Sequence, residues 1–256
     1  MTTGIVNWAL EVEYDGTPFM GWQRQKHGLA VQQVMEAAGA RLCGGAAVAA
    51  VASGRTDAGV HALGQIVQME LPDFAPYRVR EALNYHMKPH PVVVLRACVA
   101  PAEWSARFSA ISRTYRYVIS NRAAFPAVEL NRVWHVARPL DAAAMQRAAD
   151  LLLGHHDFSS FRASACQAKS PMRTLDELTV TRQGDNIIVH AKARSFLHHQ
   201  VRNMVGSLKM VGEGAWAEAR VVEVLAARDR AVAGPTAPAS GLYFVSVGYP
   251  EPLDLV

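Results

Sequence analysis

The order of predicted strands and helices repeats along this chain of 256 residues, and the repeat limits the fold more than any other feature. In the first half, apolar residues that alternate with period two predict strands, and apolar residues spaced by three and four predict helices. The predicted order is strand, helix, strand, strand, helix, strand, at residues 6–14, 31–42, 46–52, 65–71, 76–87 and 92–99.

The second half gives a related order. It predicts a strand at 113–119, a helix at 141–153, strands at 176–182 and 186–193, helices at 197–211 and 217–227, and a last strand at 242–248. Residues 120–139 contain two prolines and predict an insertion without regular structure. The tail after Pro250 is predicted to be irregular. The split βαβ pattern of ferredoxin-like domains therefore occurs twice, which predicts the fold class α+β.

Hydrophobicity, the N-terminal sequence and the cysteines indicate the cellular compartment. No run approaches the roughly 18 apolar residues of a membrane span, and Met1 to Glu11 lack the basic start and apolar core of a secretory signal. The cysteines Cys43, Cys98 and Cys166 are isolated and odd in number. This pattern argues against a disulfide framework and against a metal site, and it favours a reducing cytoplasm.

The connection from about Ser53 to Leu63 is longer than a turn requires. Turning a hairpin takes two to five residues, often with Gly or Asp. This connection holds a carboxylate, a guanidinium and several small residues between two apolar strands. Asp57-Ala58-Gly59 alone has the sequence of a plain turn, so only the whole string indicates a site.

The string Gly54-Arg55-Thr56-Asp57-Ala58-Gly59-Val60-His61-Ala62 resembles the catalytic-aspartate motif of the TruA-type tRNA pseudouridine synthases. Further blocks resemble that family in its order: Tyr14-Asp15-Gly16, Gly21-Trp22-Gln23-Arg24-Gln25, Ala106-Arg107-Phe108-Ser109-Ala110, Tyr115-Arg116-Tyr117, residues 157–162, residues 198–206 and Gly241-Leu242-Tyr243. Separate motifs in order are more specific than one short pattern. One departure is Trp104-Ser105, where the family has an aromatic residue followed by His, so Ser105 receives no role.

The resemblance implies an architecture and a substrate. Two ferredoxin-like halves, residues 1–104 and 105–256, would join into one continuous antiparallel sheet, with helices on one face and an active-site cleft on the other. It also implies a homodimer that converts uridine to pseudouridine at positions 38, 39 and 40 of the tRNA anticodon stem-loop, without a metal or another cofactor.

The distribution of charge fits an RNA partner. The net charge is only +4, but three windows hold Lys and Arg without Asp or Glu. They contain Arg107, Arg113, Arg116 and Arg122; Arg162, Lys169 and Arg173; and Lys192, Arg194, Arg202 and Lys209. Such windows suit a phosphate backbone, whose neutralisation dominates nucleic-acid affinity. The alternative interpretation of each window is a solvated basic face.

Asp57 is the one conspicuous carboxylate. Pseudouridine formation breaks the N1–C1′ bond of uridine, turns the base and rejoins it through C5, so it needs neither water nor a redox cofactor. A developing oxocarbenium ion at C1′ requires a nearby carboxylate, as in retaining glycosidases. Asp57 would either attack C1′ or remove a C2′ proton, and the sequence leaves both routes open.

Arg202 is the predicted counter-ion of Asp57, by resemblance. A carboxylate that is shielded from water is disfavoured as an anion unless a cation opposes that effect. The helix predicted at 197–211 places its apolar residues on one face and His198, Arg202 and Gly206 on another. Gly206 would permit close backbone approach. The alternative is an ordinary solvated Arg.

Tyr115 and Leu242 are predicted to contact the target base, by resemblance. Tyr115 would stack on it and help remove the C5 proton, and Leu242 would pack on it from the last strand. A half-buried strand Tyr and a core Leu are the structural alternatives. Arg24, Arg55 and Arg107 are predicted to bind the RNA, with Arg55 inserted where the target base was stacked.

Two further functions are compatible with parts of the sequence. The pairs His155-His156 and His198-His199 suggest a metal-dependent nucleotide hydrolase, but adjacent histidines on a helix do not face one ion together and no further ligand stands at the right spacing. A non-catalytic RNA-binding protein or RNA chaperone with two RRM-like sheets is the other alternative. It lacks the aromatic RNP1 signature and leaves Asp57 unexplained.

Overall fold

In a computed structural model that describes residues 4–256, the chain forms two compact units. Unit 1 comprises Met1–Arg113 and Tyr243–Val256, and unit 2 comprises Thr114–Leu242. The first three residues of the N-terminal segment lie outside the described residues. The predicted domains, residues 1–104 and 105–256, stay a prediction. The compact units differ from them by grouping residues 105–113 and the last strand with the N-terminal segment.

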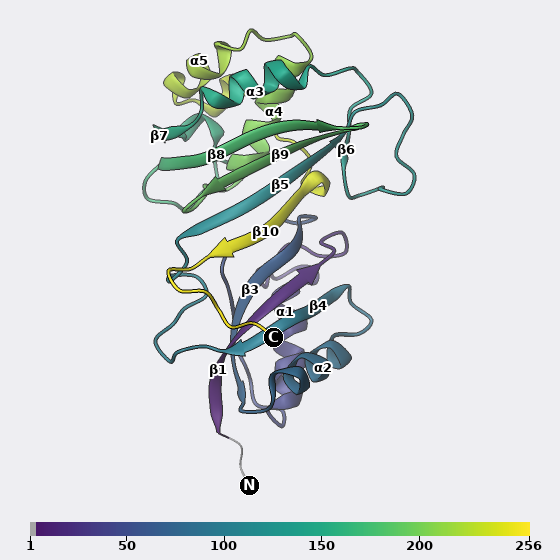
Figure 1. Ribbon diagram of the computed structural model, residues 1–256, viewed down its shortest axis with the longest axis vertical. Coiled ribbons are helices and arrows are strands. Elements are labelled where there is room, and N and C mark those ends of the chain that lie inside the picture. Colours follow the sequence, from purple (N-terminus) through teal and green to yellow (C-terminus); the bar gives the residue numbers. More distant parts are fainter. Residues whose placement is uncertain (1–3) are drawn as a thin grey trace. The chain divides into compact units, whose positions relative to one another are not determined.

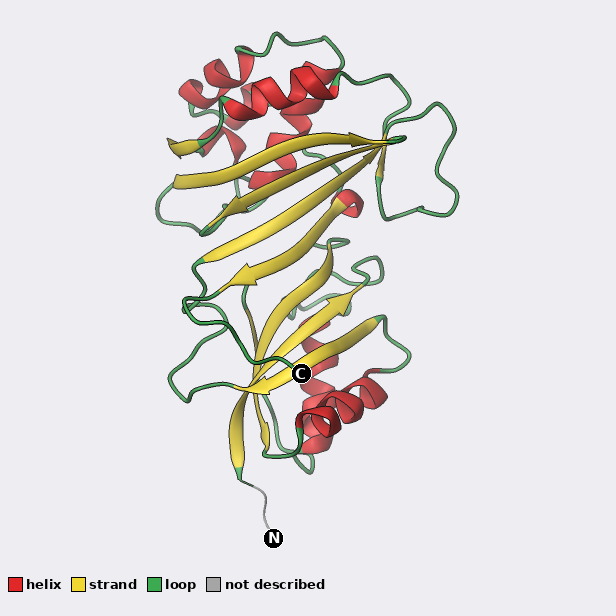
Figure 2. Ribbon diagram, in the orientation of Figure 1, coloured by secondary structure: helices red, strands yellow, loops and turns green. Residues whose placement is uncertain are grey.

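Unit 1 is a mixed sheet with two helices on one face (Figures 1 and 2). The sheet order is β4-β1-β3-β10, and β2 pairs with β3. Strand β1 is antiparallel to both β3 and β4, whereas β10 is parallel to β3. The elements are β1 (Ile5–Tyr14), α1 (Val31–Leu42), β2 (Ala50–Ala52), β3 (His61–Pro72), α2 (Pro76–Met87), β4 (Val92–Val99) and β10 (Leu242–Gly248).

Strand β1 is buried on both faces along its centre. Trp8, Leu10 and Val12 are fully buried, as period-two alternation predicts for the core face. Ala9, on the opposite face, belongs to a second cluster that the C-terminal tail covers with Tyr249, Leu253 and Leu255. The tail is irregular, as predicted, but the amides of Ala97 and Val256 each donate to the other residue's carbonyl. The tail therefore closes the sheet face that has no helix.

Unit 2 contains further strands and helices of its own. Its strand order is β5-β9-β8-β7, with β6 parallel to β5, and β8 is antiparallel to β7 and β9. The elements are β5 (Ser112–Ser120), β6 (Trp134–His135), α3 (Ala142–Asp150), β7 (Gly154–Asp157), β8 (Met172–Gln183), β9 (Asn186–Ala193), α4 (Gln200–Gly212) and α5 (Arg220–Ala227). Helix α4 contributes Met204, Val205 and Leu208 to the buried core.

The fold class α+β is confirmed, and most predicted elements appear. The helices at 31–42 and 76–87 and the strands at 92–99, 186–193 and 242–248 have the predicted bounds. The strand predicted at 46–52 is shorter and begins at Ala50, following the turn at Gly44 and Gly45, both with positive φ. The insertion at 120–139 does contain the short strand β6, and β7 was not predicted because its residues, Gly-His-His-Asp, show no apolar alternation.

Helix α4 begins three residues later than predicted. His199 has φ 63, a left-handed conformation that ends any continuous helix, so the helix starts at Gln200. His198 therefore does not share a helical face with Arg202, and that expectation was wrong. Arg202 and Gly206, one turn apart, do lie on the helix.

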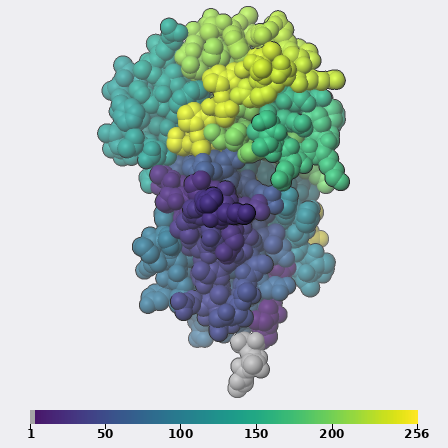
Figure 3. Space-filling view, turned by 180° about the vertical axis from the view of Figure 1, so that it is seen from behind, coloured from purple at the N-terminus to yellow at the C-terminus, as the bar shows by residue number. Residues whose placement is uncertain are grey.

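Unit 1 has a long exposed loop, and Figure 3 shows one face of the molecule. Residues 23–29, before α1, are all exposed, and the first quarter of the chain, in purple and blue, forms much of the unit 1 surface in this view. Among residues 4–256, no helix combines the length and the apolar character of a membrane span.

Candidate active site

The Asp57 loop runs from Ser53 to Val60, between β2 and β3. Its polar side chains divide by burial. Ser53 and Thr56 are buried, Asp57 is half-buried, and Arg55 is exposed. The Arg55 side chain is thus in contact with solvent, whereas the hydroxyl groups of Ser53 and Thr56 lie inside unit 1.

Buried hydrogen bonds hold the inner side of the loop. The hydroxyl groups of Tyr14 and Thr56 lie 2.8 Å apart. The Ser53 hydroxyl donates to Gln65 Oε1 at 2.7 Å, and Gln65 Nε2 donates to the Gly54 carbonyl at 2.7 Å. Gln65 is fully buried, so these bonds satisfy its amide where water cannot. The residues on either side of Arg55 are thereby fixed.

Glycines let the neighbouring segments approach the loop backbone. A Cβ at Gly21, which has φ +89, would meet the Thr56 carbonyl oxygen at 2.5 Å, and one at Gly16 would meet the Val60 carbonyl oxygen at 2.0 Å. The Trp22 amide donates to the Thr56 carbonyl at 3.0 Å. The segments around Gly16 and Gly21 therefore pack directly against the backbone of the Asp57 loop, which only glycine at these positions allows.

A histidine follows the loop at the start of β3. His61 is buried, accepts a hydrogen bond from the Gly16 amide at 3.0 Å through Nδ1, and has the same nitrogen 3.1 Å from Asp15 Oδ1. Its ring stacks on Tyr243 with a centroid distance of 4.8 Å. These contacts fasten the end of the loop to β1 and β10 within unit 1.

Two predicted RNA-binding arginines of unit 1 already have protein contacts. Arg24 pairs with Glu36 at 2.6 Å, although its side chain is 56% exposed. The guanidinium of Arg107 lies over the ring of Phe108, 5.4 Å from its centroid. Arg55 is different, because it makes no hydrogen bond or ion pair with any residue in the described range 4–256.

Arg113 connects the Arg107 segment with the Asp57 loop. Its Nε and Nη2 donate to the Ser53 carbonyl at 3.1 and 2.8 Å, and Nη2 also donates to the Arg107 carbonyl at 2.7 Å. The sequence predicted Arg113 only as part of a basic window. Its hydrogen bonds to these backbone carbonyls could not be anticipated from the sequence pattern.

In unit 2, Arg202 is oriented by the segment before β10. Its Nε donates to the Ala237 carbonyl at 2.8 Å, and the Ala237 amide donates back to the Arg202 carbonyl at 3.2 Å. Gly206 allows this contact, because a Cβ there would lie 1.7 Å from the Pro235 carbonyl oxygen. The expected close backbone approach is confirmed. The pairing of Arg202 with Asp57 stays a prediction.

Tyr115 and Tyr117 differ in their surroundings. Tyr115 is half-buried and meets Phe196 edge-on, with a centroid distance of 5.2 Å. Tyr117 is buried, and its hydroxyl donates to the Pro238 carbonyl at 2.8 Å. Burial raises the pKa of Tyr117 well above its usual value, and the nearby charge of Arg202 partly offsets the rise. Leu242 is buried, 5% exposed.

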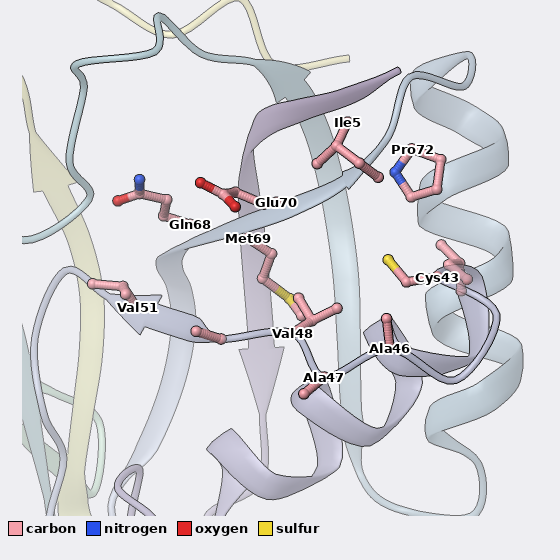
Figure 4. A pocket seen from close by; sticks show the side chains of 12 residues that line it. Ile5, Cys43, Ala46, Ala47, Val48, Val51, Gln68, Met69, Glu70 and Pro72 are labelled. Carbon is pink, nitrogen blue, oxygen red and sulfur yellow. The ribbon is translucent and has the colours of Figure 1, made fainter. Parts of the chain in front are cut away.

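A separate hollow of about 650 Å³ lies in unit 1 (Figure 4). Four small apolar side chains just before β2, at residues 46–49, form part of its wall, together with Cys43, Met69 and Glu70. Burial raises the pKa of the Cys43 thiol, so the neutral form is favoured. None of the predicted site residues lines this hollow.

Comparison with known proteins agrees with these observations. The family model described as tRNA pseudouridine synthase matches residues 11–109 and 148–250. A protein of Acidiphilium cryptum named tRNA pseudouridine synthase A is 63% identical over 244 residues, which cover 94% of this chain and 96% of that protein. The protein of the same name from Gluconobacter oxydans is 52% identical, over 97% of this chain and 92% of that protein. The one from Paramagnetospirillum magneticum is 58% identical, over 94% of this chain and 94% of that protein. The chain therefore belongs to the tRNA pseudouridine synthase family.

Proposed function

We propose that this chain converts uridine to pseudouridine at positions 38, 39 and 40 of the tRNA anticodon stem-loop, with Asp57 acting at C1′. The observation that carries the proposal is a half-buried carboxylate on a loop fixed from within by Thr56, Ser53 and Gln65. Such preorganisation is what electrostatic stabilisation of a developing positive charge requires. The names of the relatives support tRNA as the substrate.

The chemistry is an isomerisation in which the uracil stays bound. Asp57 either adds to C1′ as the N1–C1′ bond breaks, or removes the C2′ proton as that bond breaks to give a glycal. C5 then bonds to C1′, which displaces Asp57 in the first route and is accompanied by return of the C2′ proton in the second. The C5 proton finally leaves and N1 gains a proton, so the atoms of the product equal those of the substrate. Arg202 would oppose the charge of Asp57. Tyr115 would stack on the base and assist removal of the C5 proton, and Leu242 would pack against it.

The proposal includes the setting of the enzyme. We expect a homodimer in the cytoplasm without a metal, by analogy with the family. We expect no redox cofactor, because the product has the same oxidation state as the substrate. Size determination in solution tests the dimer. Activity that survives a chelator would remove the metal-dependent hydrolase from consideration.

Incubating the purified chain with unmodified tRNA and mapping pseudouridine tests the function. Asp57→Asn should leave folding and tRNA affinity unchanged but abolish modification, since the amide keeps the shape and loses the charge. Asp73→Asn is the matched control, because Asp73 is exposed at the end of β3 and should have wild-type activity. If the wild-type chain binds tRNA and forms no pseudouridine, the non-catalytic RNA-binding protein becomes the better description.

A further inference from the structure

Phe108 exposes its ring to an unusual degree. The residue is 80% exposed, more than any other Phe, Tyr or Trp in the part of the chain that the structure describes. Fully burying a Phe side chain contributes on the order of 1.5–3 kcal/mol, and this ring forgoes most of that contribution. An exposed ring on an ordered loop is available for contact with another molecule.

The segment that carries Phe108 is firmly held. The Ser105 amide donates to Ser109 Oγ at 3.1 Å, and the Ser109 amide donates to the Ser105 carbonyl at 3.0 Å. The Tyr249 hydroxyl donates to the Ala106 carbonyl at 2.8 Å, while Arg113 holds the next carbonyl, that of Arg107. The ring is therefore displayed on a fixed backbone, which lowers the entropy that a partner must overcome.

The same segment is tied to the Asp57 loop. Arg113 donates at once to the Arg107 carbonyl and to the Ser53 carbonyl, where the loop begins. One guanidinium thus sets the position of Phe108 relative to the loop, and both belong to unit 1. A molecule in contact with the loop has the ring within its reach.

The surroundings of the ring favour RNA over protein. Arg107, itself exposed, places its guanidinium 5.4 Å from the ring centroid, and between Glu103 and Glu129 the chain contains no acidic residue. An aromatic face next to an unopposed cation suits a nucleobase with its phosphate. Protein interfaces are also enriched in aromatic residues and Arg, so the choice of RNA rests on the absence of acidic residues around the ring, which suits a phosphate backbone.

We propose that Phe108 stacks on a nucleobase of the bound tRNA beside the Asp57 loop, with Arg107 on the other face of the ring. This inference rests on the proposed function, because it takes tRNA as the ligand. Every base has an aromatic face, so the contact tolerates different sequences around the target uridine.

Replacing the ring tests the contact. Phe108→Ala should weaken tRNA binding by about 5- to 150-fold, the range for loss of one base–aromatic stack. The fold should be unaffected because the side chain is exposed. Tyr85→Ala is the matched control. Tyr85 is a 70% exposed aromatic residue on α2 of unit 1 whose ring meets His86 edge-on. It lies outside the basic windows, so its replacement should leave tRNA affinity unchanged.

Phe108→Trp supplies a direct readout. It should keep wild-type affinity, and its added fluorescence, measured against the five native Trp residues, should be quenched when tRNA binds. Unchanged affinity in Phe108→Ala would overturn the inference, as would unquenched fluorescence in Phe108→Trp. A shift in oligomeric state without loss of tRNA affinity would overturn it in favour of a protein contact. If the wild type forms no pseudouridine while Phe108→Ala still loses tRNA affinity, the proposed function fails and the stacking contact stands.

Discussion

The hydroxyl groups of Tyr14 and Thr56 share a buried hydrogen bond of 2.8 Å, which joins the last residue of β1 to the residue before Asp57. The position of the carboxylate thus depends on a contact inside the protein. Replacing Tyr14 distinguishes an effect of this bond on the position of Asp57 from an effect on the stability of the fold alone.

Tyr14→Phe should lower turnover at saturating tRNA while leaving tRNA affinity unchanged, because the peptide before Asp57 loses its anchor. The variant leaves a buried hydroxyl without this partner, at a cost of about 1–3 kcal/mol in the free energy of unfolding. The double variant Tyr14→Phe with Thr56→Val should recover stability, because both hydroxyls are gone, but not turnover. Wild-type turnover in Tyr14→Phe would show that the anchor has no role in positioning.

Alkaline pH should destabilise the protein through its buried tyrosines. Burial raises the pKa of Tyr14, Tyr117 and Tyr249 above the usual value of about 10. The folded state therefore holds these protons more tightly than the unfolded chain. The resulting stability is fully present below about pH 10 and is lost as the pH rises from there toward the folded-state pKa values.

Urea unfolding between about pH 8 and pH 11 measures this loss. Tyr249→Phe should make the alkaline decline shallower. Tyr85→Phe is the control, because that ring is 70% exposed, and it should leave the decline as it is in the wild type. Equal declines in both variants would contradict the assignment to buried tyrosines.

Elements with strong periodicity were predictable, and contacts made through the backbone were not. Helix α1 and strand β9 appear with the bounds that apolar spacing predicts, because burial of one face determines both. Helix α4 does not, because the left-handed φ of His199 comes from the preceding loop and not from the helix pattern.

The candidate site shows the same division. Asp57 was recognisable from its motif, since the family pattern is specific. Its supports, Gln65 and Arg113, were not recognisable, because each donates to a backbone carbonyl that any residue type could supply. Sequence patterns identify side chains with distinctive chemistry. The residues that position those side chains are identified only from the three-dimensional structure.

Arg202→Met should nearly abolish turnover, because Asp57 loses its proposed counter-ion. Arg202 also holds the Ala237 carbonyl through Nε, so Met additionally leaves that acceptor unpaired. Arg202→Lys separates the two effects, since it keeps the charge and loses the fixed geometry, and it should retain part of the activity. Single-turnover rates for both variants, with thermal unfolding alongside, test this. Normal turnover in the Met variant across neutral pH would exclude the ion pair.

Affinity for tRNA should fall steeply as salt rises, since each phosphate contact releases counter-ions. Arg24→Gln and Arg107→Gln should each reduce the slope of log affinity against log salt by about 1. They should lower affinity more than turnover at saturating tRNA. Arg147→Gln is the control for Arg24, because Arg147 is also 56% exposed and paired with a glutamate, but it lies on α3 and is not among the predicted RNA-binding residues. A salt-insensitive affinity would contradict the assignment of these arginines to the RNA surface.

Arg55 should occupy the space that the target uridine leaves. A uridine inside a stem-loop must leave its stack before Asp57 can reach C1′, at an unstacking cost of a few kcal/mol. Arg55 lies two residues before Asp57, is exposed, and makes no hydrogen bond or ion pair with the residues the structure describes, so its planar guanidinium is available to replace the base. The alternative is a simple phosphate contact from outside the helix.

Arg55→Lys distinguishes these roles, because an ammonium group keeps the charge and cannot stack in place of a base. We expect tRNA affinity near that of the wild type with strongly reduced modification of a paired uridine. A substrate whose target uridine is already unpaired should restore much of the rate, since no stack then needs to be replaced. A phosphate contact would give the opposite pattern, because Lys would substitute for Arg and both substrates would be modified at the wild-type rate. Rates measured on the two substrates with Arg55→Lys therefore decide whether this guanidinium stabilises the flipped-out state.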